Sequence, residues 1–116
     1  MASSLTSDAS GMRRFSYKAL CDSPAGKMID WYNVQCYGCF APQTWQAILD
    51  NGWPASGLVF VMDGQEFTDK SAVAVFLALK TFAQKYSAPP LGVGIWEFGD
   101  TSVDPVVWSQ LSALCF

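Results

Sequence analysis

The stretch that decides the fold, residues 68–86, reads TDKSAVAVFLALKTFAQKY. Its apolar side chains recur at three- and four-residue steps, the spacing of one face of an α-helix; they are Val75, Phe76, Leu79, Phe82, Ala83 and Tyr86. Thr68 suits the N-cap, and Asp69 and Lys85 place their charges where the helix dipole favours them. We therefore predict a long central helix over residues 68–86.

A second face of this helix carries Ala74, Leu77 and Ala78. Small residues allow another backbone to approach closely, so this face needs a cover of its own. The sequence leaves two alternatives for the surface that packs on this face. One is a neighbouring helix of the same domain, and the other is a second copy of the chain.

Two segments near the start of the chain alternate between apolar and polar side chains. Residues 13–21 and residues 28–35 both show the two-residue period of a half-buried strand, and residues 22–26 between them are rich in turn formers. The pattern predicts a strand, a turn and a strand, with a helix over residues 12–21 as the alternative.

The remaining elements follow from turn residues and apolar runs. We predict two shorter helices, one from Pro42 to a stop at Asn51-Gly52 and one over residues 106–114. The predicted strands here are residues 58–62 and residues 91–98. Gly92 and Gly94 share one side of the last strand and leave room for a ring, a helix or a ligand. The predicted fold is α+β, with a mixed sheet of four to five strands.

The whole chain has the size of one domain. It holds 116 residues, of which 51% are hydrophobic, and we expect a flexible N-terminus over residues 1–11 and a single globular domain over residues 12–116. The net charge is −3, and residues 28–69 contain five acidic side chains and no Lys or Arg, which argues against a nucleic-acid partner. No apolar run is long enough to span a membrane, so we expect a cytoplasmic protein with reduced cysteines.

The chain contains no histidine. This absence removes Ser-His and Cys-His nucleophilic machinery, the usual imidazole general base and most catalytic zinc sites. The sequence therefore favours a protein that is not an enzyme, and we expect neither a cofactor nor a metal.

Cys36-Tyr-Gly-Cys39 is a CxxC motif at the change from a predicted strand to a predicted helix. The order strand, CxxC, helix, strand, helix, Pro-Pro, strand, helix resembles the thioredoxin arrangement, which implies Cys36 as nucleophile and Cys39 as resolving thiol. The chain departs from that family at Gln35, where the family has Trp, and in lacking the last strand of the closing hairpin. Buried thiols acting as small apolar residues are the simpler explanation, and a zinc site with Cys21 and Cys115 is another.

Aromatic residues crowd the segment 30–53, which carries two aspartates and no positive charge. Aromatic rings beside carboxylates attract flat apolar or cationic ligands, although rings in a small domain also simply fill its core. The predicted ligand-binding residues come from this segment and from the last strand; they are Asp30, Trp31, Tyr37, Trp45, Trp53, Trp96 and Glu97.

These patterns favour a non-catalytic binding module, homodimeric, with an aromatic-lined acidic groove for a small apolar or cationic ligand or a protein partner. The first alternative is a thiol-disulfide oxidoreductase that uses Cys36 and Cys39. The second is a structural or inhibitory protein-interaction module.

Overall fold

The computed structural model describes Leu5 and residues 14–38, 41–86, 88, 90–97, 99 and 104–115, the last stretch without the side chains of residues 111, 114 and 115. The predicted flexible N-terminus, residues 1–11, lies outside the described residues except for Leu5. Cys39 also lies outside them.

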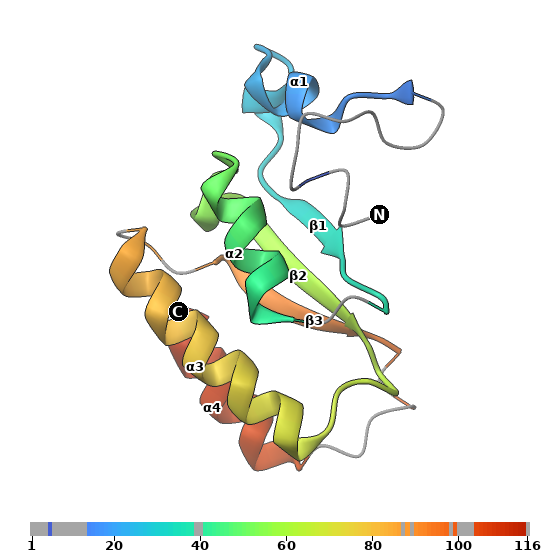
Figure 1. The fold of residues 1–116 in the computed structure, drawn as a ribbon, viewed down its shortest axis with the longest axis vertical. Helices are drawn as coiled ribbons and strands as arrows, with labels where there is room; N and C mark the ends of the chain where they lie inside the picture. Colours follow the sequence, from blue (N-terminus) through green and yellow to red (C-terminus); the bar gives the residue numbers. More distant parts are fainter. Residues whose placement is uncertain are drawn as a thin grey trace.

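Three parallel strands alternate with helices along the chain (Figure 1). In order these are β1 (Tyr32–Gln35), α2 (Pro42–Asp50), β2 (Leu58–Asp63), α3 (Asp69–Lys85), β3 (Gly92–Trp96) and α4 (Pro105–Cys115). The spatial order of the strands is β1-β2-β3. Because parallel crossovers are right-handed and both run in the same direction here, α2 and α3 lie on the same face of the sheet.

The core lies between this face and the helices. Leu58, Phe60 and Met62 of β2 are fully buried, and the Phe60 ring stacks on the ring of Trp45 from α2 at 4.4 Å between centroids. Helix α4 runs beside α3 and also contacts β3 (Figure 1). The three helices therefore form a single layer over one face of the sheet, which we call the covered face.

The opposite face, here the open face, follows from the strand register. Side chains alternate along β2, and directly paired residues of neighbouring strands point the same way. Val59 pairs with Asn33 and Gly92, Val61 with Gln35 and Gly94, and Asp63 with Trp96. The open face therefore consists of these residues: Asn33, Gln35, Val59, Val61, Asp63, Gly92, Gly94 and Trp96. Helices α2 and α3 lie on the other side of the sheet (Figure 1), and α1 (Tyr17–Asp22) borders the open face at β1, where Tyr17 lines a cavity with Asn33 and Gln35.

The predicted central helix is confirmed as α3. The Thr68 hydroxyl accepts a hydrogen bond from the Ser71 amide, and the Ser71 hydroxyl accepts one from the Thr68 amide, so the two residues form a capping box. Asp69 lies in the first turn and Lys85 in the last. The predicted helices from Pro42 and over residues 106–114 and the predicted strands at 58–62 and 91–98 are confirmed within a few residues.

The fold combines helices and strands as predicted, but the mixed sheet of four to five strands is wrong for the part of the chain that the structure describes. The segment predicted as a strand over residues 13–21 contains a helix, α1 (Tyr17–Asp22), as in the alternative prediction. Tyr17 and Cys21, which pack on the core, are four residues apart and so fit a helical face as well as a strand. Ser16 favours the helix, because its hydroxyl accepts a hydrogen bond from the Ala19 amide at 3.2 Å and so caps the N-terminus of α1.

The second predicted strand, residues 28–35, is a strand only in its last four residues. Its beginning belongs to a short 3-10 turn, η3 (Gly26–Met28), and Met28 is exposed. A similar turn, η4 (Ala55–Gly57), leads into β2. Among the helices that the structure describes, none has the length and apolar character needed to cross a membrane.

Candidate functional site

The carboxyl ends of the three parallel strands meet at one edge of the sheet, where open α/β sheets commonly bind ligands. The chain leaves β1 through Cys36 and Tyr37, and Gly38 turns it with a φ of 66°. It leaves β3 at Trp96, whose side chain is 66% exposed and whose carbonyl accepts a hydrogen bond from Gly64 at 2.9 Å. Two partly exposed aromatic rings, Tyr37 and Trp96, therefore flank the end of β2.

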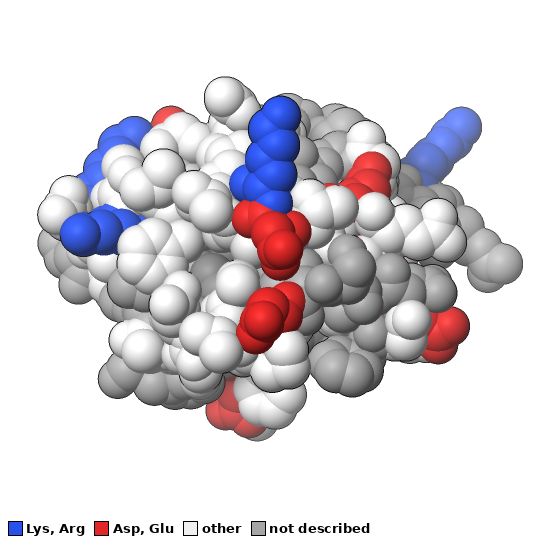
Figure 2. Space-filling model, turned by 90° about the horizontal axis from the view of Figure 1, so that it is seen from below, with Lys and Arg blue, Asp and Glu red and all other residues white. Residues whose placement is uncertain are grey.

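This carboxyl edge is acidic. It carries the strand-end and helix-start carboxylates, which are Asp63, Glu66, Asp69, Glu97 and Asp104. Figure 2 views the molecule from this end and shows Asp and Glu side chains near its centre, next to a Lys or Arg side chain, with charges of both signs toward its rim. The N-termini of α2, α3 and α4 point here, and their dipoles offset part of the negative charge.

Several of these carboxylates also hold the local backbone. Asp63 accepts from the amide of Gln65 at 3.0 Å, which shapes the turn after β2. Glu66 accepts from the amide of Gly38 at 3.0 Å and so ties the end of β1 to that turn. Asp104 caps α4 through the Val106 amide at 2.7 Å, as its position before Pro105 predicts.

The open face has no side chains along β3 at Gly92 and Gly94, a stretch that we call the glycine strip. A Cβ added to Gly92 would find Val59 Cγ2 at 3.9 Å, and one added to Gly94 would find Val61 Cγ2 at 3.8 Å, which are ordinary contact distances within the sheet. Two neighbouring positions without side chains therefore lower the surface along β3. The glycine strip has Val59 and Val61 of β2 beside it and ends at Trp96, whose cross-strand partner is Asp63.

The structure separates the predicted ligand-binding residues into three places. Trp45 and Trp53 are buried in the core on the helix side of the sheet. Asp30 and Trp31 are exposed at the amino end of β1, more than about 13 Å of strand away from the carboxyl edge. Only Tyr37, Trp96 and Glu97 reach the carboxyl edge.

The aromatic segment also borders a small cavity of about 130 Å³ beside β1. Its lining includes the rings of Tyr17, Tyr32 and Trp53. Tyr32 and Trp53 meet edge to face at 5.4 Å, and the Trp53 indole donates to the carbonyl of Leu5 at 3.2 Å. No described carboxylate lines this cavity, so it lacks the acidic character predicted for the groove.

The CxxC motif lies at the end of β1. The Cys36 side chain is 0% exposed, and its amide continues the sheet by donating to Val61 at 2.8 Å. A thiol must be reachable to attack a disulfide, so this burial does not favour Cys36 as a nucleophile. Burial, together with the negative charge of Asp22, raises the pKa of the Cys21 thiol. Within the described residues, no three His, Cys, Asp or Glu side chains are placed to hold a metal ion.

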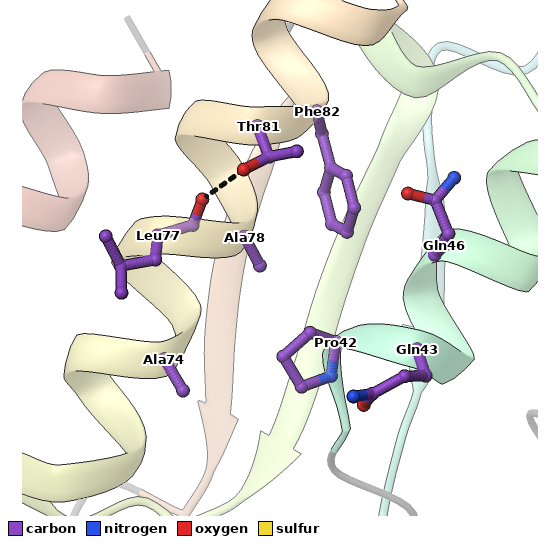
Figure 3. Close-up of a pocket in the computed structure, with 8 residues that line it drawn as sticks. All are labelled: Pro42, Gln43, Gln46, Ala74, Leu77, Ala78, Thr81 and Phe82. Atoms are coloured by element: carbon purple, nitrogen blue, oxygen red, sulfur yellow. Dashed lines mark hydrogen bonds between the residues drawn. The ribbon is translucent and has the colours of Figure 1, made fainter.

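A larger groove of about 480 Å³ lies between α2 and α3, on the outer side of the helix layer (Figure 3). Helix α3 lines it with Ala74, Leu77, Ala78, Thr81 and Phe82, and α2 lines it with Pro42, Gln43 and Gln46. The predicted second face of the central helix therefore lies beside α2, which is the neighbouring helix expected as one of its two alternative partners. The space between α2 and this face is the groove.

A polar cluster joins the two helices beyond this groove. Asp50 accepts hydrogen bonds from the Tyr86 hydroxyl at 2.6 Å and from Lys85 at 2.9 Å, and Gln46 donates to the Tyr86 oxygen. These donors, with Tyr86 contributing most, lower the pKa of Asp50 to about 2. The same contacts raise the pKa of Lys85, whereas burial followed by the Asp50 carboxylate raises that of Tyr86.

Seven open-face residues were missing from the predicted ligand-binding residues: Asn33, Gln35, Val59, Val61 and Asp63, together with Gly92 and Gly94, which were predicted only to leave room for a ligand. A signal for the first two was present, because two amides in a four-residue strand are unusual for a strand buried on both sides. The valines carry no such signal, since they continue an apolar run with their buried neighbours.

The chain matches no protein-family model, no curated protein and no solved structure.

Proposed function

We propose that the protein is a non-catalytic binding module that takes a flat, cationic small molecule on the open face, at the carboxyl edge of the sheet. The observation that carries this proposal is the one-sided helix layer. Parallel sheets are normally covered on both faces, and here the face opposite α2 and α3 holds two glycines and an exposed indole.

The side chains around the glycine strip support a ligand of this chemistry. The face of an indole attracts a cation through the ring quadrupole, and Trp96 is exposed at the end of this strip. Asp63, its direct cross-strand partner, and Glu97, its neighbour in the chain, add negative charge. Gly92 and Gly94 let a planar ring approach the backbone closely.

A fluorescence titration with the N-methylquinolinium cation tests the proposal. Trp31 provides a matched control, because it is 53% exposed but lies at the opposite end of the strands. We expect saturable quenching in the wild type that disappears in Trp96→Ala and persists in Trp31→Ala. Neutral quinoline should bind about tenfold more weakly, the factor for about 1.4 kcal/mol of cation–π and charge attraction.

An Asp63→Asn variant separates charge from shape. It keeps the side-chain volume and an acceptor oxygen for the Gln65 amide, so the turn should survive, while the affinity for the cation should fall toward that for quinoline. Quenching that is equal in Trp96→Ala and wild type, or equal for the cation and quinoline, would show that the proposed surface is not the binding site.

A further inference from the structure

The outer surface of α3 carries a ridge whose two ends have opposite charge. The ridge, which we call the α3 ridge, consists of residues four apart: Asp69, Val73, Leu77, Thr81 and Lys85. All five are exposed, including two large apolar side chains, and Leu77 at the centre is 58% exposed. The ridge borders the groove between α2 and α3, whose α3 wall includes the small residues Ala74 and Ala78.

We propose that the α3 ridge and this groove form the interface of a homodimer in which two copies of α3 pack in opposite directions. A twofold axis that passes beside Leu77 reverses the ridge. It therefore places Leu77 against the partner's Leu77, Val73 against the partner's Thr81, and Asp69 against the partner's Lys85. The last contact occurs twice, once at each end.

The charges of α3 fit this arrangement and argue against a random apolar contact. Lys70 and Lys80, which lie off the ridge, come opposite the partner's Gln84 and the partner's Ala74, so no two cations face each other. Antiparallel helices also bring opposite ends of their dipoles together. A parallel pair would instead set Asp69 against Asp69 and Lys85 against Lys85.

The groove supplies the space that such a contact needs. When ridges of residues four apart on two helices interdigitate, each ridge lies in the groove beside the other, with the axes crossing at about −50°. The groove beside Leu77 has the methyl groups of Ala74 and Ala78 along α3 and is closed by Pro42 of α2 (Figure 3). The partner's Leu77 therefore enters a largely apolar groove.

Lys85 is shared in this dimer. Its ammonium already contacts Asp50 at 2.9 Å, and both side chains of that pair are half exposed. The partner's Asp69 therefore adds a second carboxylate to the same ammonium and need not break the first contact. The dimer forms on the helix layer, so it leaves the open face accessible and does not depend on the proposed ligand.

Sedimentation velocity over a range of micromolar concentrations at low salt tests the proposal. We expect a monomer–dimer equilibrium in the wild type and a monomer in Leu77→Glu, because a carboxylate would then enter the groove. Asp69→Lys and Lys85→Asp should each weaken the dimer about tenfold, since each sets like charges against each other at both ends. The double variant Asp69→Lys/Lys85→Asp should restore it.

The double variant isolates the contact between copies. Lys85→Asp and the double variant both lose the contact with Asp50. Asp69→Lys and the double variant both change the charge at the start of α3. The double variant therefore differs from each single variant only in the charges that meet across the interface. Lys27→Asp, an exposed charge reversal in η3 and outside α3, serves as the control and should dimerise like the wild type. A wild type that stays monomeric, or a double variant no better than the single ones, overturns the proposal.

Discussion

The two faces of the same three strands carry different side chains and meet different surroundings. On the covered face, Leu58, Phe60 and Met62 are fully buried under the helix layer. On the open face, Val59 and Val61 of the same strand are only partly buried, beside two glycines of β3. One strand that is apolar throughout thus has a packing side and an accessible side, and its composition does not distinguish them.

The covered face should be the more sensitive to loss of volume. Phe60→Ala removes a fully buried ring that stacks on Trp45, and we expect it to lower the free energy of unfolding by about 3–5 kcal/mol. Urea denaturation followed by circular dichroism measures this. A loss below about 1 kcal/mol would mean that the covered face is not the main core.

A matched pair of isosteric changes compares the faces directly. Val75→Thr introduces a hydroxyl at a fully buried position of α3, and we expect a loss of about 1–3 kcal/mol. Val61→Thr introduces the same hydroxyl on the open face, where water can reach it, and should cost less than about 0.5 kcal/mol. Equal losses in the two variants would show that the open face is packed as tightly as the covered one.

Adding a side chain to the glycine strip should affect stability and binding in opposite directions. A methyl group on Gly94 meets only an ordinary contact, Val61 Cγ2 at 3.8 Å, and alanine removes the conformational cost of glycine within a strand. We expect Gly94→Ala to raise stability by about 0.5–1 kcal/mol and to weaken quinolinium binding. Thermal unfolding and the fluorescence titration measure the two effects, and a destabilised variant would indicate that something already lies close above Gly94.

The smallest expected effect concerns the polar cluster at the rim of the helix layer. Because its contacts lower the pKa of Asp50 to about 2, their stabilising contribution is present above the ordinary aspartate value of about 3.9 and is lost as the pH falls through about 2. The stability difference between wild type and Asp50→Asn should therefore shrink over this range. Urea denaturation at about pH 6 and at about pH 2, on either side of the ordinary aspartate pKa of about 3.9, measures this stability difference. A stability difference that is the same at both pH values would contradict this role.

The predictions that succeeded rest on local physical chemistry. Helix α3 is long, has a capping residue at its start and repeats its apolar residues with the helical period, so neighbouring residues alone define it. The segment 13–21 failed because Tyr17 and Cys21 fit both a strand and a helix, and a short segment contains too few repeats to separate the two periods.

The predicted ligand-binding residues come together only where they lie at the ends of strands. Tyr37, Trp96 and Glu97 come to one edge because parallel strands end together, but the sequence does not state that the strands are parallel. Trp45 is as aromatic as Trp96, yet one ring stacks in the core and the other faces outward. Composition therefore predicted an aromatic cluster where the structure has a core and a surface.

The sequence by itself determined the central helix, its caps, the order of most elements and the side of the last strand on which the two glycines lie, because these depend on residues close together in the chain. Only the tertiary structure decided that α2, α3 and α4 share one face. That outcome follows from the handedness and direction of two crossovers, which join segments far apart in sequence. The same outcome places Gly92, Gly94 and Trp96 on the face opposite these helices.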